Sequence, residues 1–268
     1  MSNFVVNPYS FVSSGCSSYP DSLAGTADGN VNSATIVTAT GAPSGIGENC
    51  LNFVSTSSQS VNIPDNSAFD WTSGGSCTFW FAPHVIQDRR FIAKGSNSGW
   101  EVLSEGGDDN KKMKFRLKSG ETLTTITGTS DIETDGTWYF ISVVYDQSAG
   151  TMKLYVDGEE EANATGIGAI NTTTVDVYIG SNSSPSQYYD GLMEEVGIFD
   201  YAISEATIDE LYNGGDGAKV SELTTTCSGI VAYYSCQAFD SGDLPNNAIP
   251  TWLLFDTCLN SSFGPLRL

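Results

Sequence analysis

The sequence predicts an all-β protein, an antiparallel β-sandwich with one short helix and with flanking N- and C-terminal arms. Short apolar runs bounded by turn residues recur at close spacing between residues 50 and 199. The chain is 40% hydrophobic, contains 28 Gly and is rich in Ser, Thr and Asn, a mixture typical of many strands joined by polar turns. Only one segment has helical periodicity, so alternating βαβ units are not expected.

The 268 residues divide into three predicted segments. Residues 1–20 form an N-terminal arm and residues 21–217 form the sandwich domain. Residues 218–268 form a C-terminal extension that packs on the sandwich or on a partner. All-β sandwiches of about 200 residues fold as one unit, so a single main domain is expected.

The strands are expected in the following order. An edge strand at 34–39 is followed by eleven strands at 51–54, 60–63, 77–81, 91–94, 101–104, 112–117, 123–127, 138–145, 151–156, 175–179 and 192–199. Both alternating sets of residues in 138–145 are largely apolar, which predicts a central strand covered on both faces. In 151–156, Met152 and Leu154 alternate with Lys153 and Tyr155, which predicts a half-exposed strand.

Residues 204–213 are the helical segment. Ser204 is expected to cap the N-terminus, Ile208 and Leu211 lie on one apolar face, and Asn213 begins the stop signal. This helix is expected to lie across one end of the sandwich.

Charge restricts the partners. A formal net charge of -21 repels phosphate backbones and anionic lipids, so no nucleic-acid partner is expected. No run approaches the ~18 apolar residues of a membrane span, so no membrane insertion is expected. The first residues lack the basic region and the apolar core of a secretory signal, so export by that route is not expected.

Six segments carry a resemblance to a known family. In chain order they are "LNFVSTSSQSVNIP", "CTFWFAP", "FIAKG", "DGTWYFISVVYDQSAGTMKLYVDG", "VYIGS" and "YYDGLMEEVGIFDYAISEATIDELY". Together they resemble the signature of laminin-G-like domains, which belong to the concanavalin A-like jelly rolls that also include pentraxins and legume lectins. The resemblance spans residues 50–214 and implies a jelly-roll sandwich.

The resemblance also bears on metal binding, because such domains often hold calcium at the sandwich rim through Asp, Asn and backbone oxygens. The loop before Asp190 contains few oxygen ligands, so the double-calcium site of pentraxins is not expected. The resemblance implies at most one structural calcium ion, bound by Asp190 with Asp28 or Asn30. No other cofactor is expected.

Glu194 and Glu195 are adjacent carboxylates in the apolar strand at 192–199, where each needs a partner. In laminin-G-like domains, acidic residues in this segment have no catalytic meaning. The resemblance therefore implies a structural role, with hydrogen bonds from backbone amides or from Lys and Arg groups. A glycosidase needs two carboxylates facing one sugar cleft, whereas neighbours in an ordinary strand point to opposite faces. No catalytic residue and no enzyme activity are expected.

Two classes of function stay open. The first is a non-enzymatic virion surface protein, a capsid-decoration or tail- or fibre-associated subunit that contacts other virion proteins and its own copies, with surface glycans as further targets. The second is a glycan-binding module of a bacterial cell-surface protein, and a glycosidase is the third alternative. Apolar residues in both arms favour assembly on a particle. The expected assembly residues are Phe4, Tyr9, Phe11, Trp252, Leu254 and Phe255.

Overall fold

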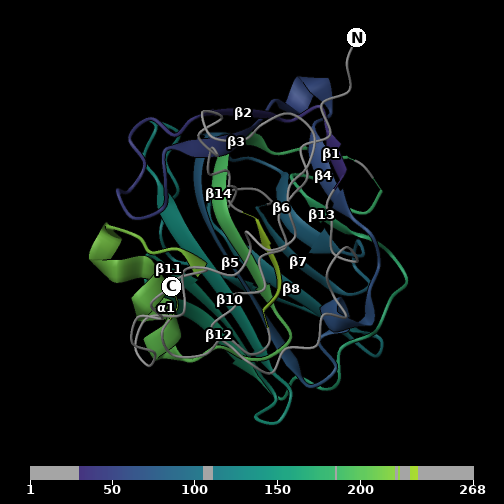
Figure 1. The fold of residues 1–268 in the computed structure, drawn as a ribbon. Helices are drawn as coiled ribbons and strands as arrows, with labels where there is room; N and C mark the ends of the chain where they lie inside the picture. Colours follow the sequence, from purple (N-terminus) through teal and green to yellow (C-terminus); the bar gives the residue numbers. More distant parts are fainter. Residues whose placement is uncertain (1–29, 105–110, 185, 221–222, 224–229, 235–268) are drawn as a thin grey trace, which may run out of the picture.

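The computed structural model describes residues 30–104, 111–184, 186–220, 223 and 230–234. In this part of the chain, two antiparallel β-sheets pack face to face and one short α-helix lies beside them (Figure 1). The prediction of an antiparallel sandwich with one α-helix is confirmed. The arm at 1–20 and most of the extension at 218–268 lie outside the described residues, so the segment boundaries stay predictions.

Sheet A has seven strands. In spatial order they are β1 (Asn30–Asn32), β4 (Ser60–Ile63), β13 (Val177–Ile179), β6 (Arg89–Lys94), β7 (Trp100–Ser104), β8 (Lys114–Ser119) and β9 (Thr122–Thr127). Sheet B has eight. They are β12 (Glu159–Thr165), β11 (Thr151–Val156), β10 (Tyr139–Asp146), β5 (Gly74–Val85), β14 (Asp190–Phe199), β3 (Asn49–Phe53) and β2 (Thr35–Thr38), with β15 (Ile230–Tyr234) also paired to β14. The predicted edge strand at 34–39 is confirmed as β2, and the structure adds β1, β12 and β15 to the predicted strands.

Alternating residues of the central strands divide between two apolar cores. In β5, Phe79 and Phe81 lie in the main core between the sheets, whereas Trp80 lies in a second core on the outer face of sheet B. The same division occurs in β10, where Ile141 points to the main core and Phe140 to the outer core. The prediction that this strand is covered on both faces is therefore confirmed.

Helix α1 (Glu205–Tyr212) provides much of that outer cover. Ser204 caps its N-terminus and Asn213 ends it in the left-handed conformation, as predicted. Ile208 and Leu211 are buried in the outer core. The predicted position across one end of the sandwich is wrong, because the apolar face of the helix packs against the outer face of sheet B.

The prediction that the strand at 151–156 is half exposed is wrong, because helix α1 covers the outer face of this strand. Tyr155 of β11 is buried in the outer core, and its hydroxyl lies 3.2 Å from Oε1 of Glu205 in α1. The strand is therefore more buried than its alternating pattern indicates, because the pattern does not show that a helix covers the outer face.

Strand β15 adds the described part of the C-terminal extension to the sandwich. It pairs with β14 at Val196–Phe199, whereas β3 pairs with the preceding residues of β14, so the two strands follow one another along one edge. Val231 enters the main core and Tyr233 the outer core. No helix in the described part of the chain has the length and apolar character that crossing a bilayer requires.

Candidate functional site

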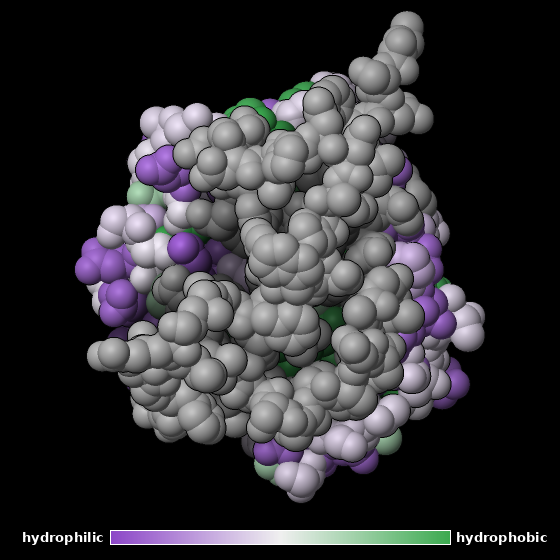
Figure 2. All heavy atoms as spheres, in the orientation of Figure 1, coloured by the Kyte–Doolittle hydropathy of each residue, from purple (hydrophilic) through white to green (hydrophobic). Residues whose placement is uncertain are grey.

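A pocket of about 330 Å³ opens at the outer core of sheet B, beside the end of α1. Its walls come from segments far apart in the sequence. The described lining residues are Gly41, Ala42, Pro43, Trp80, Gly136, Thr137, Trp138, Asp157, Tyr212 and Gly215. Figure 2 shows hydrophilic residues on the side of the molecule where α1 lies. The volume is at the lower end of the range for small-ligand pockets, about 300–1,000 Å³.

Three aromatic side chains line the pocket; Tyr212 is partly exposed, whereas Trp80 and Trp138 are 2% and 8% exposed. Trp80 of β5 stacks on Tyr212 of α1, with ring centroids 6.0 Å apart and planes 18° apart. Tyr212 also stacks on Phe140, at 6.2 Å. The indole Nε1–H of Trp138 donates to the carbonyl of Thr40 at 3.2 Å, which fixes the ring against the loop that contains Gly41. The rings are therefore held in place before any ligand arrives.

Asp157 supplies the charged group of the pocket. It lies in the turn between β11 and β12 with a φ of 50°, a conformation that Asp tolerates better than most residues. Its backbone N–H donates to the carbonyl of Phe140, and its Oδ1 accepts from the N–H of Phe140, both at 2.8 Å. Burial raises the pKa of Asp157, and the charge of Glu161 adds to this effect. The carboxylate is thus fixed and partly removed from water.

Two exposed glycines line the pocket. Gly41 has a φ of 73° and Gly136 a φ of 95°, both in the left-handed region that favours glycine. A Cβ atom built at either position would meet no heavy atom within 4 Å. Neither glycine carries a side chain and both are exposed, so their peptide groups stay accessible beside the aromatic rings.

A second pocket, of about 440 Å³, lies among the loops around Asp65, Asp70 and Thr173. The ammonium of Lys94 lies 2.5 Å from Oδ1 of Asp65 and 3.6 Å from Oδ1 of Asp70, and it donates to the carbonyl of Val175 at 3.0 Å. The described lining has no aromatic ring, and its two carboxylates already neutralise a buried lysine. This pocket is less suited to an apolar or uncharged ligand than the aromatic one.

Glu194 and Glu195 were predicted to point to opposite faces of the strand, but a bulge brings both side chains to the outer face of sheet B. The ladder between β14 and β5 shifts register between Glu194 and Gly197, and Glu195 has a φ of 52°. Both oxygens of Glu195 accept from the hydroxyl of Tyr233 at 2.7 Å, and one accepts from the N–H of Val220 at 3.1 Å. These donors belong to the outer core, so the prediction of an ordinary strand is wrong here.

Glu194 faces the same side. It lies opposite Trp80 in the ladder, and Trp80 belongs to the outer core. Cys50 also belongs to the outer core, and burial together with the charge of Glu194 raises the pKa of Cys50 to about 12. Glu194 and Glu195 are each only 1% exposed. A sugar chain therefore has no access to this carboxylate pair, although both groups lie on one face.

Asp190 lies at the start of β14 and has partners of its own. Its Oδ2 accepts from the N–H of Ser55 at 2.9 Å and from the hydroxyl of Ser55 at 2.7 Å, and its Oδ1 lies 3.3 Å from Nδ1 of His84. Burial opposes ionisation, but the Ser55 hydrogen bonds and His84 outweigh it and lower the pKa of Asp190. His84 is largely exposed at the end of β5.

The described residues do not test the calcium prediction for Asp190. Within the described ranges, no three His, Cys, Asp or Glu side chains come together as metal ligands. Asp28 and the side chain of Asn30 lie outside the described residues, and so do all six predicted assembly residues of the two arms. The calcium site of Asp190, Asp28 and Asn30 stays a prediction.

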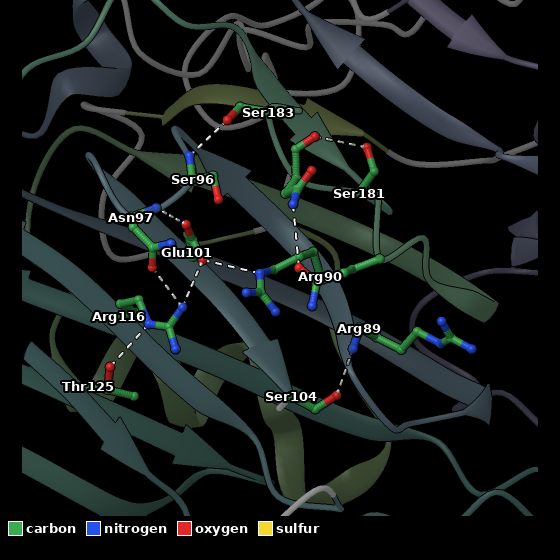
Figure 3. Close-up of polar contacts among 12 residues, drawn as sticks. Arg89, Arg90, Ser96, Asn97, Glu101, Ser104, Arg116, Thr125, Ser181 and Ser183 are labelled. Carbon is green, nitrogen blue, oxygen red and sulfur yellow. Dashed lines mark hydrogen bonds and ion pairs between the residues drawn. The ribbon is translucent and has the colours of Figure 1, made fainter. Parts of the chain in front are cut away.

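A buried ionic network lies on sheet A. Figure 3 shows Arg90 of β6 and Arg116 of β8 pointing toward Glu101 of β7 between them. The Oε2 atom of Glu101 lies 3.2 Å from Nε of Arg90 and 3.5 Å from Nη1 of Arg116. Arg116 also donates to Oδ1 of Asn97 at 3.0 Å and to Oγ1 of Thr125 at 3.1 Å. These three charged side chains are buried, so the network ties three neighbouring strands together.

The two antiparallel sheets, their strand order and the one short α-helix of the described residues define a β-sandwich of the jelly-roll class. The family model described as the concanavalin A-like lectin/glucanases superfamily, of laminin-G type, matches residues 55–209, more than half of the chain. The chain belongs to this superfamily.

Solved structures agree with this fold. The binding domain of Paraclostridial Mosquitocidal Protein 1 is 14% identical, with a TM-score of 0.50, over 71% of this chain and 50% of that one. The binding domain of Botulinum Neurotoxin DC in complex with SialylT is 16% identical, with a TM-score of 0.51, over 70% of this chain and 46% of that one. The chain thus spans about half the length of these structures, and the likeness shows the fold. No curated protein matches the chain in sequence.

Proposed function

We propose that this chain is a non-enzymatic, lectin-like protein that binds glycans in the pocket beside α1. The observation that carries the proposal is the combination of Trp80, Trp138 and Tyr212 with the fixed carboxylate of Asp157 around one open pocket. Binding pockets typically combine an aromatic lining with a few placed polar groups, and a sugar presents both an apolar C–H face and hydroxyl groups. The superfamily includes lectins, and one neighbouring structure is a binding domain in complex with SialylT.

The described pocket also favours binding over hydrolysis. Glycoside hydrolysis typically uses two carboxylates that flank the scissile bond. Among the described lining residues, Asp157 is the one carboxylate. The carboxylates of Glu194 and Glu195 lie outside this pocket and are buried, so a substrate cannot reach them.

The substitution Thr137→Arg tests the proposal. Thr137 lines the pocket with an exposed side chain, so a long side chain there is expected to block the entrance and weaken glycan binding at least about tenfold. Because surface substitutions usually change stability by less than about 0.5 kcal/mol, the melting temperature should stay close to that of the wild type. Binding is measured on a glycan array and then by calorimetry with the best glycan.

Thr122→Arg is the matched control, because Thr122 is also exposed but lies on edge strand β9 of sheet A. It adds the same charge and should leave binding unchanged. If Thr137→Arg bound every glycan as the wild type does, the pocket would not be the glycan site.

We further propose that this glycan-binding sandwich acts on a virion surface, as a capsid-decoration or tail- or fibre-associated subunit. The support is the apolar content of the two arms, which lie outside the family match. Burying even ~400 Å² of such surface would contribute roughly 10 kcal/mol before ordering costs, enough to anchor a subunit on a particle. The alternative is a glycan-binding module at a bacterial cell surface, and the fold alone does not separate the two.

Deleting residues 1–20, or separately 251–268, tests the assembly proposal. We expect at least one truncated protein to stay folded and to lose co-sedimentation with particles from the source material. If both deletions left the protein folded and its sedimentation with particles unchanged, the arms would not be assembly elements. Binding on the glycan array should survive both deletions, which separates assembly from glycan recognition.

A further inference from the structure

We infer that the pocket selects an uncharged sugar residue, whose hydroxyl groups donate to the carboxylate of Asp157, and that it discriminates against acidic sugars. The inference rests on the proposed glycan-binding function and specifies the ligand class of the same pocket.

The first argument is the charge of the walls. Among the described lining residues, Asp157 is the one charged side chain, and none is Lys or Arg. Burial raises the pKa of Tyr212, and the charges of Asp157 and Glu159 raise it further, so these carboxylates act on the pocket wall. A negative ligand group would meet a negative field there, in a site that is partly shielded from water.

The neighbouring strands do not offset this field within the described structure. Glu159 and Glu161 follow Asp157 in β12. Lys153, on β11, lies 2.7 Å from Oε2 of Glu160 and 3.0 Å from Oε1 of Glu205, so its charge is already paired. An acidic sugar would thus find no described basic partner in the pocket.

The second argument is the hydrogen-bonding capacity of Asp157. An ionised carboxylate only accepts, and its two oxygens offer about four lone-pair directions. The N–H of Phe140 occupies one direction at Oδ1. The remaining capacity suits hydroxyl donors, and hydrogen bonds to a charged acceptor are stronger than those between neutral groups. A sugar face packed on the partly exposed ring of Tyr212 can present its hydroxyls to this acceptor.

The test uses an array of matched glycan pairs that differ by an acidic group. Galactose oligomers are paired with galacturonate oligomers, and lactose is paired with its sialylated form. The wild type is expected to bind the neutral member of a pair at least about tenfold more tightly than the acidic member.

Asp157→Asn is the diagnostic variant. Asn keeps an oxygen for the N–H of Phe140 and tolerates a positive φ. Because the folded-state pKa of Asp157 is raised, the ionised carboxylate costs stability at neutral pH, so removing it should leave the melting temperature unchanged or slightly higher. Neutral-glycan binding should weaken at least about tenfold, and the preference for the neutral member should shrink.

The outcomes separate this inference from the proposed function. If the wild type bound acidic members as tightly as neutral ones and Thr137→Arg abolished both, the ligand-class inference would be overturned while the glycan site stood. Equal neutral binding by Asp157→Asn and the wild type would overturn the role of the carboxylate. Binding that survives Thr137→Arg, or no binding to any pair, would overturn the proposed glycan site and the inference with it.

Discussion

Replacing Glu195 with Ala is expected to lower the free energy of unfolding by about 2–6 kcal/mol. Its carboxylate accepts from the hydroxyl of Tyr233 and from the N–H of Val220, and all three groups are buried. The substitution leaves two buried donors without this acceptor, and each such loss costs about 1–3 kcal/mol. The melting temperature should fall by roughly 10 °C in thermal unfolding followed by circular dichroism.

Tyr233→Phe is the matched variant, because it removes one donor and keeps the carboxylate bound to Val220. It should cost about 1–2 kcal/mol, less than Glu195→Ala. Two variants with wild-type stability would contradict the role of Glu195 as the link between β14, β15 and the segment at Val220.

The same carboxylates test the non-enzymatic part of the proposal. The double substitution Glu194→Gln and Glu195→Gln is expected to lower thermal stability and to leave glycan binding intact. Polysaccharide turnover by the wild type that disappears in this double variant would show instead that the pair is catalytic.

Glu101→Gln is expected to destabilise the protein by about 3–5 kcal/mol. Glu101 lies buried between Arg90 and Arg116, and the neutral amide removes the negative charge that attracts both guanidinium groups. Removing one partner of a buried ion pair typically costs about 3–5 kcal/mol. The loss is measured by urea unfolding, with the slope checked to confirm two-state behaviour.

Glu133→Gln is the surface control. Glu133 also pairs with a basic residue, Lys111 at 3.2 Å, but both side chains are about half exposed. Its loss should cost less than about 1 kcal/mol. If Glu101→Gln cost no more than this control, the network would not hold the three strands of sheet A together.

The strands were predictable from sequence because their period-2 pattern is local. Trp138 to Tyr145 is apolar at both sets of positions, and β10 is covered on both faces. The pattern also indicated that something covers the outer face, but it did not identify the cover. The apolar face of α1 was the available signal, since Ile208 and Leu211 need a surface on which to pack.

Two features were beyond sequence reasoning for physical reasons. The positive φ of Glu195 is uncommon for a non-glycine residue, and this bulge brings both glutamates to one face. The pocket was missed because its walls join Gly41, Trp80, Trp138, Asp157 and Tyr212 through long-range packing. The Asp-Gly-Thr-Trp stretch before β10 and the turn at Asp157 were visible, but nothing local showed that they meet.

The most direct test of the glycan site is a nuclear magnetic resonance titration of the full chain with a neutral oligosaccharide chosen from the array. The account predicts saturable shifts of the indole N–H signals of Trp80 and Trp138 and of the amides of Gly136 and Asp157, and little change at Trp100 in the main core. Saturable shifts confined to sheet A, with these pocket signals unchanged, would contradict it.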